Sequence, residues 1–215
     1  MDRKRTKVKP TRTYDSPRRR DQAARTRASI LAAARALFLR DGLAATTIAA
    51  IAERATVSVD TIYKSFGGKP GLLRALCDDA LAGEGPVHAE ARSDALQREG
   101  AAADDVVRGL GRLSAEVAPR VAPILLLIRD GAAGSADIAA LRTEVDEQRL
   151  QRMTQNAKTL ASRGFLRRGV SVDRAAETMW LYTAPELFEL LVVGRGWSAL
   201  RYGDFVADAL VAALL

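Results

Sequence analysis

Apolar side chains recur every three or four residues along most of this chain, the spacing that places them on one face of an α-helix. A first helix is predicted from Pro17 to Arg40, where Asp41-Gly42 ends it, and its inner face carries Ile30, Ala34, Leu37 and Phe38. No segment shows the period of two that a half-buried strand requires. The pattern therefore predicts an all-α protein of about nine helices.

Two short helices are predicted next, separated by a break of three residues. The first begins at Thr46-Thr47 and buries Ile48, Ile51, Ala52 and Ala55. After the break at 55–57, Ser58 is placed to cap the second helix, whose inner face carries Ile62 and Phe66. Two short helices joined by a tight turn, after a longer helix, are the composition of a helix-turn-helix unit.

The second helix ends at Gly67-Gly68, and Lys69-Pro70 begins another. Gly83 to Ala103 is rich in Gly, Ala and charge without a clean period, so we expect a loop with at most an irregular helix there. Helical patterns resume at 104–117, 121–130, 136–163, 173–193 and 198–215, with breaks or kinks expected at Pro119, Pro123 and Pro185.

The charge is concentrated at one end of the chain. Lys and Arg number 33 against 26 Asp and Glu, a net charge of +7. Residues 1–27 alone carry +8, residues 1–77 carry +11, and residues 78–215 carry −4. A basic patch confined to one end indicates a polyanion such as DNA as the partner. We expect a disordered basic arm at 1–15, a helix-turn-helix DNA-binding domain at 16–77, and a helical regulatory and dimerisation domain at 78–215.

Several other classes of protein are excluded by composition. The longest uncharged stretch, 42–52, has eleven residues, whereas crossing a bilayer takes about 20. One cysteine and one histidine rule out an internal disulfide and a zinc finger. A cytoplasmic protein without a cofactor or a bound metal is expected.

The stretch TTIAAIAERATVSVDTIYKSFGGKPGLL at 46–73 resembles the DNA-binding domain of the TetR family of bacterial transcriptional regulators. That family typically shows a Thr-Thr start, Ile-Ala-Glu, Val-Ser, and then Tyr, Phe, Lys and Leu-Leu at these spacings. The resemblance is strong over about 28–77 and weaker over the rest of 14–215. It implies a dimeric regulator, most often a repressor, that binds a palindromic operator in double-stranded DNA.

The resemblance also implies a set of DNA contacts. Phosphate contacts are implied at the start of the first short helix, base-reading positions at the start of the second, and backbone contacts beside them: Thr46 and Thr47; Ser58, Val59, Asp60 and Thr61; Tyr63, Lys64 and Lys69. Some of these residues also have a purely structural interpretation. Ser58 could serve only as a cap, Tyr63 could only pack its ring, and Lys69 could only be solvated.

Two positions depart from the family's pattern. The turn residue usually filled by glycine is Thr56, whose branched side chain resists a positive φ, so the turn either carries strain or adopts another conformation. Asp60 places a negative charge on the helix that would read the bases. Phosphates repel it, but it can accept a hydrogen bond from cytosine N4, so we expect it to discriminate bases rather than add affinity.

The resemblance assigns two further roles to the C-terminal part. The last two helices would form a four-helix bundle with a second copy, and a small-molecule pocket would control DNA binding. Plausible lining residues are Leu126, Met153, Trp180, Tyr182 and Phe188, although aromatic and methionine side chains at helical spacing also fit an ordinary core. Few polar groups interrupt the apolar faces, so an apolar or aromatic effector is expected.

Two alternatives to a specific regulator remain open. The basic arm could make the chain a non-specific architectural DNA-binding protein. A helical-bundle enzyme is the other, but Gly109-Leu110-Gly111 lacks the third glycine and the preceding strand of a dinucleotide-binding loop, and we interpret it as a turn.

Deleting residues 2–12 tests the role of the arm, because the deletion removes six basic side chains. Each phosphate contact contributes about 0.9 to the slope of log affinity against log salt, so the slope should fall by several units. Fluorescence anisotropy with labelled DNA over a salt series measures this slope. If the slope does not change, the arm makes no phosphate contacts.

Overall fold

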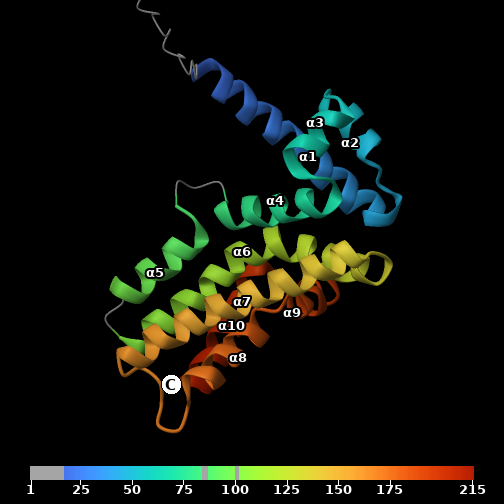
Figure 1. The fold of residues 1–215 in the computed structure, drawn as a ribbon. Coiled ribbons are helices and arrows are strands. Elements are labelled where there is room, and N and C mark those ends of the chain that lie inside the picture. Colours follow the sequence, from blue (N-terminus) through green and yellow to red (C-terminus); the bar gives the residue numbers. More distant parts are fainter. Residues whose placement is uncertain (1–16, 84–86, 100–101) are drawn as a thin grey trace, which may run out of the picture.

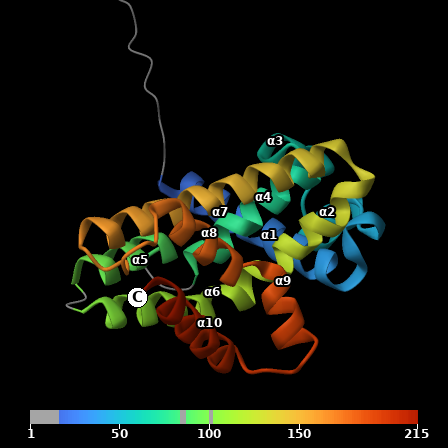
Figure 2. The same ribbon diagram turned by 90° about the horizontal axis from the view of Figure 1, so that it is seen from below.

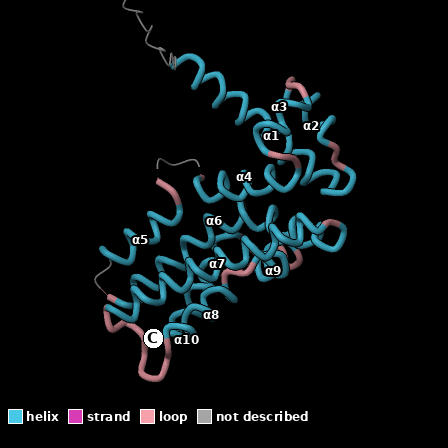
Figure 3. The backbone as a smooth tube through the Cα atoms, viewed as in Figure 1, coloured by secondary structure: helices cyan, strands magenta, loops and turns pink. Residues whose placement is uncertain are grey.

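The computed structural model describes residues 17–83, 87–99 and 102–215. The arm expected at 1–15 lies outside these residues. Within them the protein is all-α and no strand occurs, as the hydrophobic pattern predicts (Figure 1, Figure 3).

Four helices make up the N-terminal part: α1 (Pro17–Ala45), α2 (Ile48–Ala55), α3 (Val59–Phe66) and α4 (Lys69–Ala82). Gly42, with φ of 78° and ψ of 167°, interrupts the helical geometry of α1, so the regular helix ends where the sequence indicates. Helix α2 packs against α1, α3 packs against α2 and α4, and α4 runs between this group and the remaining helices (Figure 1).

The region expected to be a loop contains a regular helix, α5 (Ala89–Glu99). That expectation was wrong because the buried face of α5 consists of Ala89, Ser93 and Gln97, which share one side of the helix but carry no hydrophobic signal. Alanine and the long charged residues of the segment are good helix formers, so local propensity supports a helix that the periodicity conceals.

Helix α6 (Ala103–Gly131) is one continuous helix where two were expected. It passes through Pro119 and Pro123, which lack the backbone N–H that an interior helical position donates. Gly109 and Gly111 lie inside this helix and not in a turn, which corrects their interpretation from sequence.

A short 3₁₀ turn, η1 (Ala132–Gly134), leads into α7 (Ala136–Ser162). Then follow α8 (Val172–Tyr182), the single turn α9 (Pro185–Phe188), the π-helical segment η2 (Glu189–Val193) and α10 (Ala199–Leu214). The break expected at Pro185 is confirmed, since α8 ends three residues before it.

Helices α6 and α10 cross closely (Figure 2). A Cβ atom at Gly111 would lie 2.5 Å from the Cα of Ala207, and one at Gly203 would lie 2.4 Å from the Cβ of Ala115. The two glycines therefore allow the backbones to approach more closely than any larger side chain would permit.

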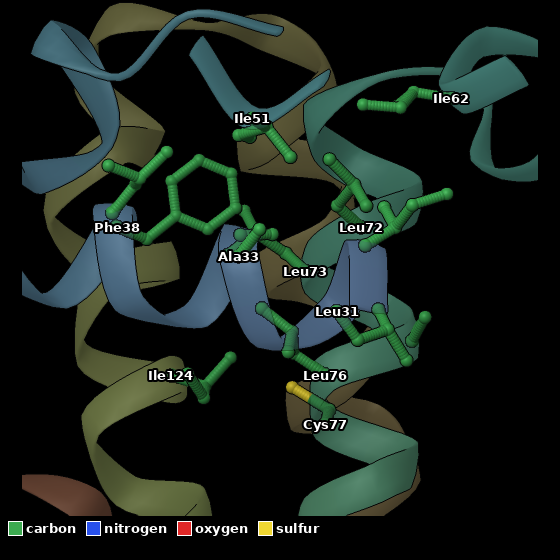
Figure 4. Packing of buried hydrophobic residues seen from close by; sticks show 14 of the residues in the cluster. Leu31, Ala33, Phe38, Ile51, Ile62, Leu72, Leu73, Leu76, Cys77 and Ile124 are labelled. Atoms are coloured by element: carbon green, nitrogen blue, oxygen red, sulfur yellow. The ribbon is translucent and has the colours of Figure 1, made fainter. Parts of the chain in front are cut away.

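Two hydrophobic cores share α6. The first contains Ile30, Phe38, Ile51, Ile62 and Leu72 of the N-terminal helices, together with Ile124 and Ile128 of α6 and residues of α7. The second is formed by the C-terminal helices and contains Ala118 and Ala122 of α6. In Figure 4, Ile124 lies beside Leu76 and Cys77 of α4. The boundary predicted at residue 77 thus falls inside α4, and a division into two domains there stays a prediction.

Among the helices in the described ranges, none combines the length and the apolar character needed to cross a bilayer.

Candidate DNA-binding surface

Helix α3 is held by a cap at its start and by a buried side chain at its centre. The Ser58 hydroxyl accepts a hydrogen bond from the Thr61 backbone N–H at 3.1 Å, which confirms the predicted cap. Ile62 is fully buried in the first core. The opposite face of the same helix, with Asp60, Tyr63 and Lys64, is exposed. One face is thus anchored while the other is open to a partner.

The exposed face of α3 carries both apolar and charged groups. Val59 is 39% exposed and Tyr63 52% exposed. The Tyr63 ring lies over Gly68, where a Cβ atom would be 3.6 Å from its Cε1, so the ring packs on one side and remains open on the other.

The two threonines at the start of α2 have different roles. Thr47 is exposed and caps the helix, accepting a hydrogen bond from the Ala50 N–H at 3.0 Å. Thr46, implied as a phosphate contact, is only 2% exposed. Its hydroxyl and its N–H both donate to the Gly42 carbonyl, at 2.8 and 3.3 Å. Thr46 therefore ties α2 to the end of α1 and offers no free side-chain donor to DNA.

Lys69 is likewise turned toward the protein. Its ammonium group donates to the Leu43 carbonyl at 2.7 Å, linking the start of α4 to the segment after Gly42. The alternative that Lys69 is merely solvated does not describe this contact.

The turn between the two short helices is strained. Thr56 has φ of 57° and ψ of 46°, the left-handed conformation, and among the described residues it is the only non-glycine with a positive φ. The sequence left open whether this turn carries strain or adopts another conformation. The structure shows the usual left-handed turn, with the strain carried by Thr56. The N–H of Thr56 donates to the Glu53 carbonyl and that of Val57 to the Ala52 carbonyl, which ends α2.

Two contacts that hold α3 were not found from sequence. The Arg27 guanidinium of α1 lies 4.9 Å from the centre of the Phe66 ring. At Gly71 a Cβ atom would lie 1.6 Å from the Phe66 carbonyl oxygen, so only glycine lets α4 approach the end of α3. The available signals in the sequence were a basic residue three positions before the predicted apolar face and a glycine one residue after Pro70.

A cavity of about 230 Å³ lies between α4, α5, α6, α7 and the C-terminal helices. Met153 and Phe188, expected from sequence, line it, whereas Leu126, Trp180 and Tyr182 are not among its lining residues. Polar residues that sequence reasoning did not select also line it: Ser93, Arg149, Arg152 and Asn156. These residues fall on helix faces that the apolar pattern does not mark.

Burial alters the titration of groups around this cavity. It lowers the pKa of Arg149, whose guanidinium remains paired with Asp146 at 3.1 Å and donates to the Trp180 and Thr183 carbonyls. It raises the pKa of the Tyr202 hydroxyl to about 12 and that of the Cys77 thiol to about 12.

Helix α3 is capped and amphipathic, follows α2 after a tight turn, and is fixed against the first core while its outer face is open. This arrangement defines a helix-turn-helix DNA-binding protein. Comparison with known proteins leads to the same class of protein. The family model described as "Bacterial regulatory proteins, tetR family" matches residues 30–76. The HTH-type transcriptional regulator YvkB of Bacillus subtilis is 30% identical over 182 residues, covering 84% of this chain and 86% of YvkB. The chain belongs to the TetR family of transcriptional regulators.

Two solved structures extend the similarity of fold over nearly the whole chain. The SmeT–triclosan complex has a TM-score of 0.69 at 21% identity, covering 88% of this chain and 91% of SmeT. The regulator FadR from Bacillus subtilis, in complex with stearoyl-CoA, has a TM-score of 0.68 at 17% identity, covering 87% and 99%.

Replacing Thr56 by glycine should stabilise the protein. A non-glycine residue in the left-handed conformation destabilises the folded state by about 1–2 kcal/mol. Glycine removes this strain, but its greater freedom in the unfolded chain offsets about 0.5–1 kcal/mol of the gain. The free energy of unfolding should therefore rise by about 0.5–1 kcal/mol, as measured by urea denaturation. Thr143→Gly on the exposed face of α7 is the matched control, and it should lower that free energy by roughly 0.3 kcal/mol or more. A Thr56→Gly variant less stable than the wild type would show that Thr56 does not strain the folded state.

Proposed function

We propose that this protein is a transcriptional repressor that binds a palindromic operator as a homodimer and is released by a small-molecule effector. The observation that carries the proposal is α3, anchored by Ile62 and presenting Val59, Asp60, Tyr63 and Lys64 to the outside. A helix of this kind enters the major groove and reads base edges. The protein would act in the cytoplasm.

The proposed contacts divide into reading and supporting residues. Ser58 to Thr61 lie at the start of α3, where helix-turn-helix proteins contact bases, and Tyr63 and Lys64 lie toward the flanking phosphates. Thr47 offers an exposed hydroxyl at the start of α2. Thr46 and Lys69 support the surface from below through their bonds to Gly42 and Leu43.

Helix α6 provides a physical route from an effector to the reading head. It lines the cavity with Val117, Val121 and Leu125, and it places Ile124 and Ile128 in the core below α1. The Arg35 guanidinium of α1 donates from both Nη atoms to the Arg120 carbonyl, at 3.3 Å each. Arg120 in turn donates from Nε to the Ala80 carbonyl of α4 at 3.0 Å. A ligand that moved α6 would therefore shift α1 and α4 with it, provided that it binds one arrangement more tightly.

A surface suited to a second copy lies on the C-terminal helices. Half of the ten large apolar side chains exposed in the described residues fall between 181 and 205: Leu181, Leu190, Val193, Leu200 and Phe205. Phe205 also makes edge contacts with the rings of Tyr182 and Trp197. Exposed apolar side chains concentrated in one part of a chain are typical of an interface between protein chains, and a two-fold axis through these helices would pair two DNA-binding units.

Competition binding tests whether the protein reads sequence. The operator should be found by footprinting the DNA that flanks the protein's own coding region, and random DNA should compete for the protein about 10³-fold less well than the operator. A ratio near one would indicate an architectural DNA-binding protein. In the same assay, Asp60→Ala should relax discrimination at one base pair per half-site, by a factor of about 5–150.

Asp173→Ala is the matched control for that substitution. Asp173 is also an exposed aspartate in the first turn of a helix, but it lies in α8, so its loss has the same local cost without touching DNA. If Asp60→Ala weakened binding equally on every operator variant, Asp60 would not be a base-reading residue.

The double substitution Leu190→Glu with Leu200→Glu should convert the dimer to a monomer, because it buries two carboxylates in the proposed interface. Sedimentation velocity would show the loss of dimer, and operator affinity should fall at least about 100-fold as the second half-site contact is lost. Leu150→Glu, at an exposed leucine of α7, should leave both properties unchanged. A monomeric wild-type protein, or a dimeric double variant, would count against this interface.

A further inference from the structure

We propose that the ligand of the cavity is uncharged and mainly apolar, and that it offers one hydrogen-bond acceptor to the side-chain amide of Asn156. This inference rests on the proposed function, in which an effector occupies that cavity.

The orientation of Asn156 follows from a chain of hydrogen bonds between α5 and α7. The carbonyl of Ser93 can only accept, and the Gln97 side-chain NH₂ donates to it at 3.2 Å. The same NH₂ donates to Asn156 Oδ1 at 3.0 Å, and the Ser93 hydroxyl donates to that oxygen at 3.4 Å. Since Oδ1 faces α5, the Nδ2 group of Asn156 is left as a donor pointing away from α5.

That donor belongs to a buried residue at the cavity wall. Asn156 is only 3% exposed, it lines the cavity, and within the described residues its Nδ2 group makes no hydrogen bond. Buried polar groups are almost always hydrogen-bonded, so an unused amide donor beside a cavity indicates a partner that occupies the cavity.

The other hydroxyl groups of the lining are already engaged with the backbone. Ser114 donates to the Gly111 carbonyl at 2.6 Å, Thr183 to the Met179 carbonyl at 2.8 Å, and Tyr202 to the Tyr182 carbonyl at 3.4 Å. The remainder of the wall consists mainly of Leu, Val, Ala and Met side chains. A ligand therefore gains most by being apolar except at the point that faces Asn156.

The charged groups of the wall disfavour an anion. Each lining arginine is ion-paired: Arg74 with Glu144, Arg149 with Asp146, and Arg152 with Asp94. Two carboxylates, Asp78 and Glu90, line the cavity as well. An anionic ligand would lose its hydration without gaining an uncompensated positive charge, which is costly in an apolar site. The stearoyl-CoA bound by FadR is thus a poor guide to the effector of this chain.

Volume limits the size of the ligand. The cavity measures about 230 Å³, and an apolar cavity of about 150 Å³ holds benzene. One ring with a short substituent, or an aliphatic chain of similar bulk, fits this space.

Three probes of equal size separate the terms of the proposal: acetophenone (neutral, one acceptor), cumene (neutral, no acceptor) and benzoate (anionic). Ligand-observed NMR with the full chain, without DNA, would give their relative affinities. Acetophenone should bind, and benzoate should bind at least about 100-fold more weakly. Benzoate binding as tightly as acetophenone would overturn the proposal.

Asn156→Leu tests the hydrogen bond itself. Acetophenone and cumene differ in hydration, but this difference is the same for both proteins and cancels when the variant's affinity ratio is compared with that of the wild type. The ratio of acetophenone to cumene affinity should fall at least about tenfold, or about 1.4 kcal/mol, relative to wild type. Gln155→Leu, at the neighbouring exposed position of α7, should leave that ratio unchanged. An unchanged ratio in Asn156→Leu would also overturn the proposal.

A measurement on the wild-type protein covers the case in which Asn156→Leu does not fold. The Asn156 side-chain NH₂ resonances should move downfield with acetophenone and not with cumene, and equal shifts with both would contradict the hydrogen bond. Effector control is tested separately by adding acetophenone to the protein–operator complex. If acetophenone binds with the predicted selectivity but DNA affinity is unchanged, release by a ligand fails while the ligand chemistry stands.

Discussion

The arrangement of this protein depends on α6, a single helix built into two hydrophobic cores at once. Ile124 and Ile128 pack below the helix-turn-helix unit, while Ala118 and Ala122 pack among the C-terminal helices. Because protein interiors are close-packed, α6 cannot shift in one core without repacking the other. Its two prolines remove backbone hydrogen bonds in the same stretch, and the Arg35 contact with Arg120 attaches α1 there. The part of the helix that lacks these hydrogen bonds is therefore the part that joins the two cores.

The outer face of α3 is positioned by contacts that face inward. Caps from Thr47 and Ser58 fix where the two short helices begin, and Gly71 lets α4 support the end of α3. Thr56 is held at a positive φ by the packing on either side of it, which is how strain is usually retained near functional sites. The exposed side chains on the outer face of α3 are not needed for these contacts, so binding and not packing can determine which residues occupy those positions.

Sequence reasoning succeeded where the signals are local. Caps, helix-ending glycines and the apolar face through Ile51 and Ile62 predicted the helix-turn-helix unit almost to the residue. It failed where tertiary contacts decide. The face of α5 is buried through Ser93 and Gln97, which carry no hydrophobic signal, and α6 continues through two prolines because both cores hold it in place.

The cavity shows the same limit of sequence reasoning. Met153 and Phe188 line it, but Leu126 and Trp180 lie on equally apolar segments and are not part of its wall. Which face of an apolar helix meets an internal space is set by neighbours far away in the chain. No periodicity could have identified Asn156, a polar residue, as part of that wall.

Cys77 is the single cysteine of the chain. It lies in the first core and at the cavity wall, and burial raises the pKa of its thiol to about 12. At neutral pH only roughly one thiol in 10⁵ is ionised, and the thiolate is the form that peroxides and electrophiles attack. The buried Cys77 thiol is therefore poorly suited to receive an oxidative signal.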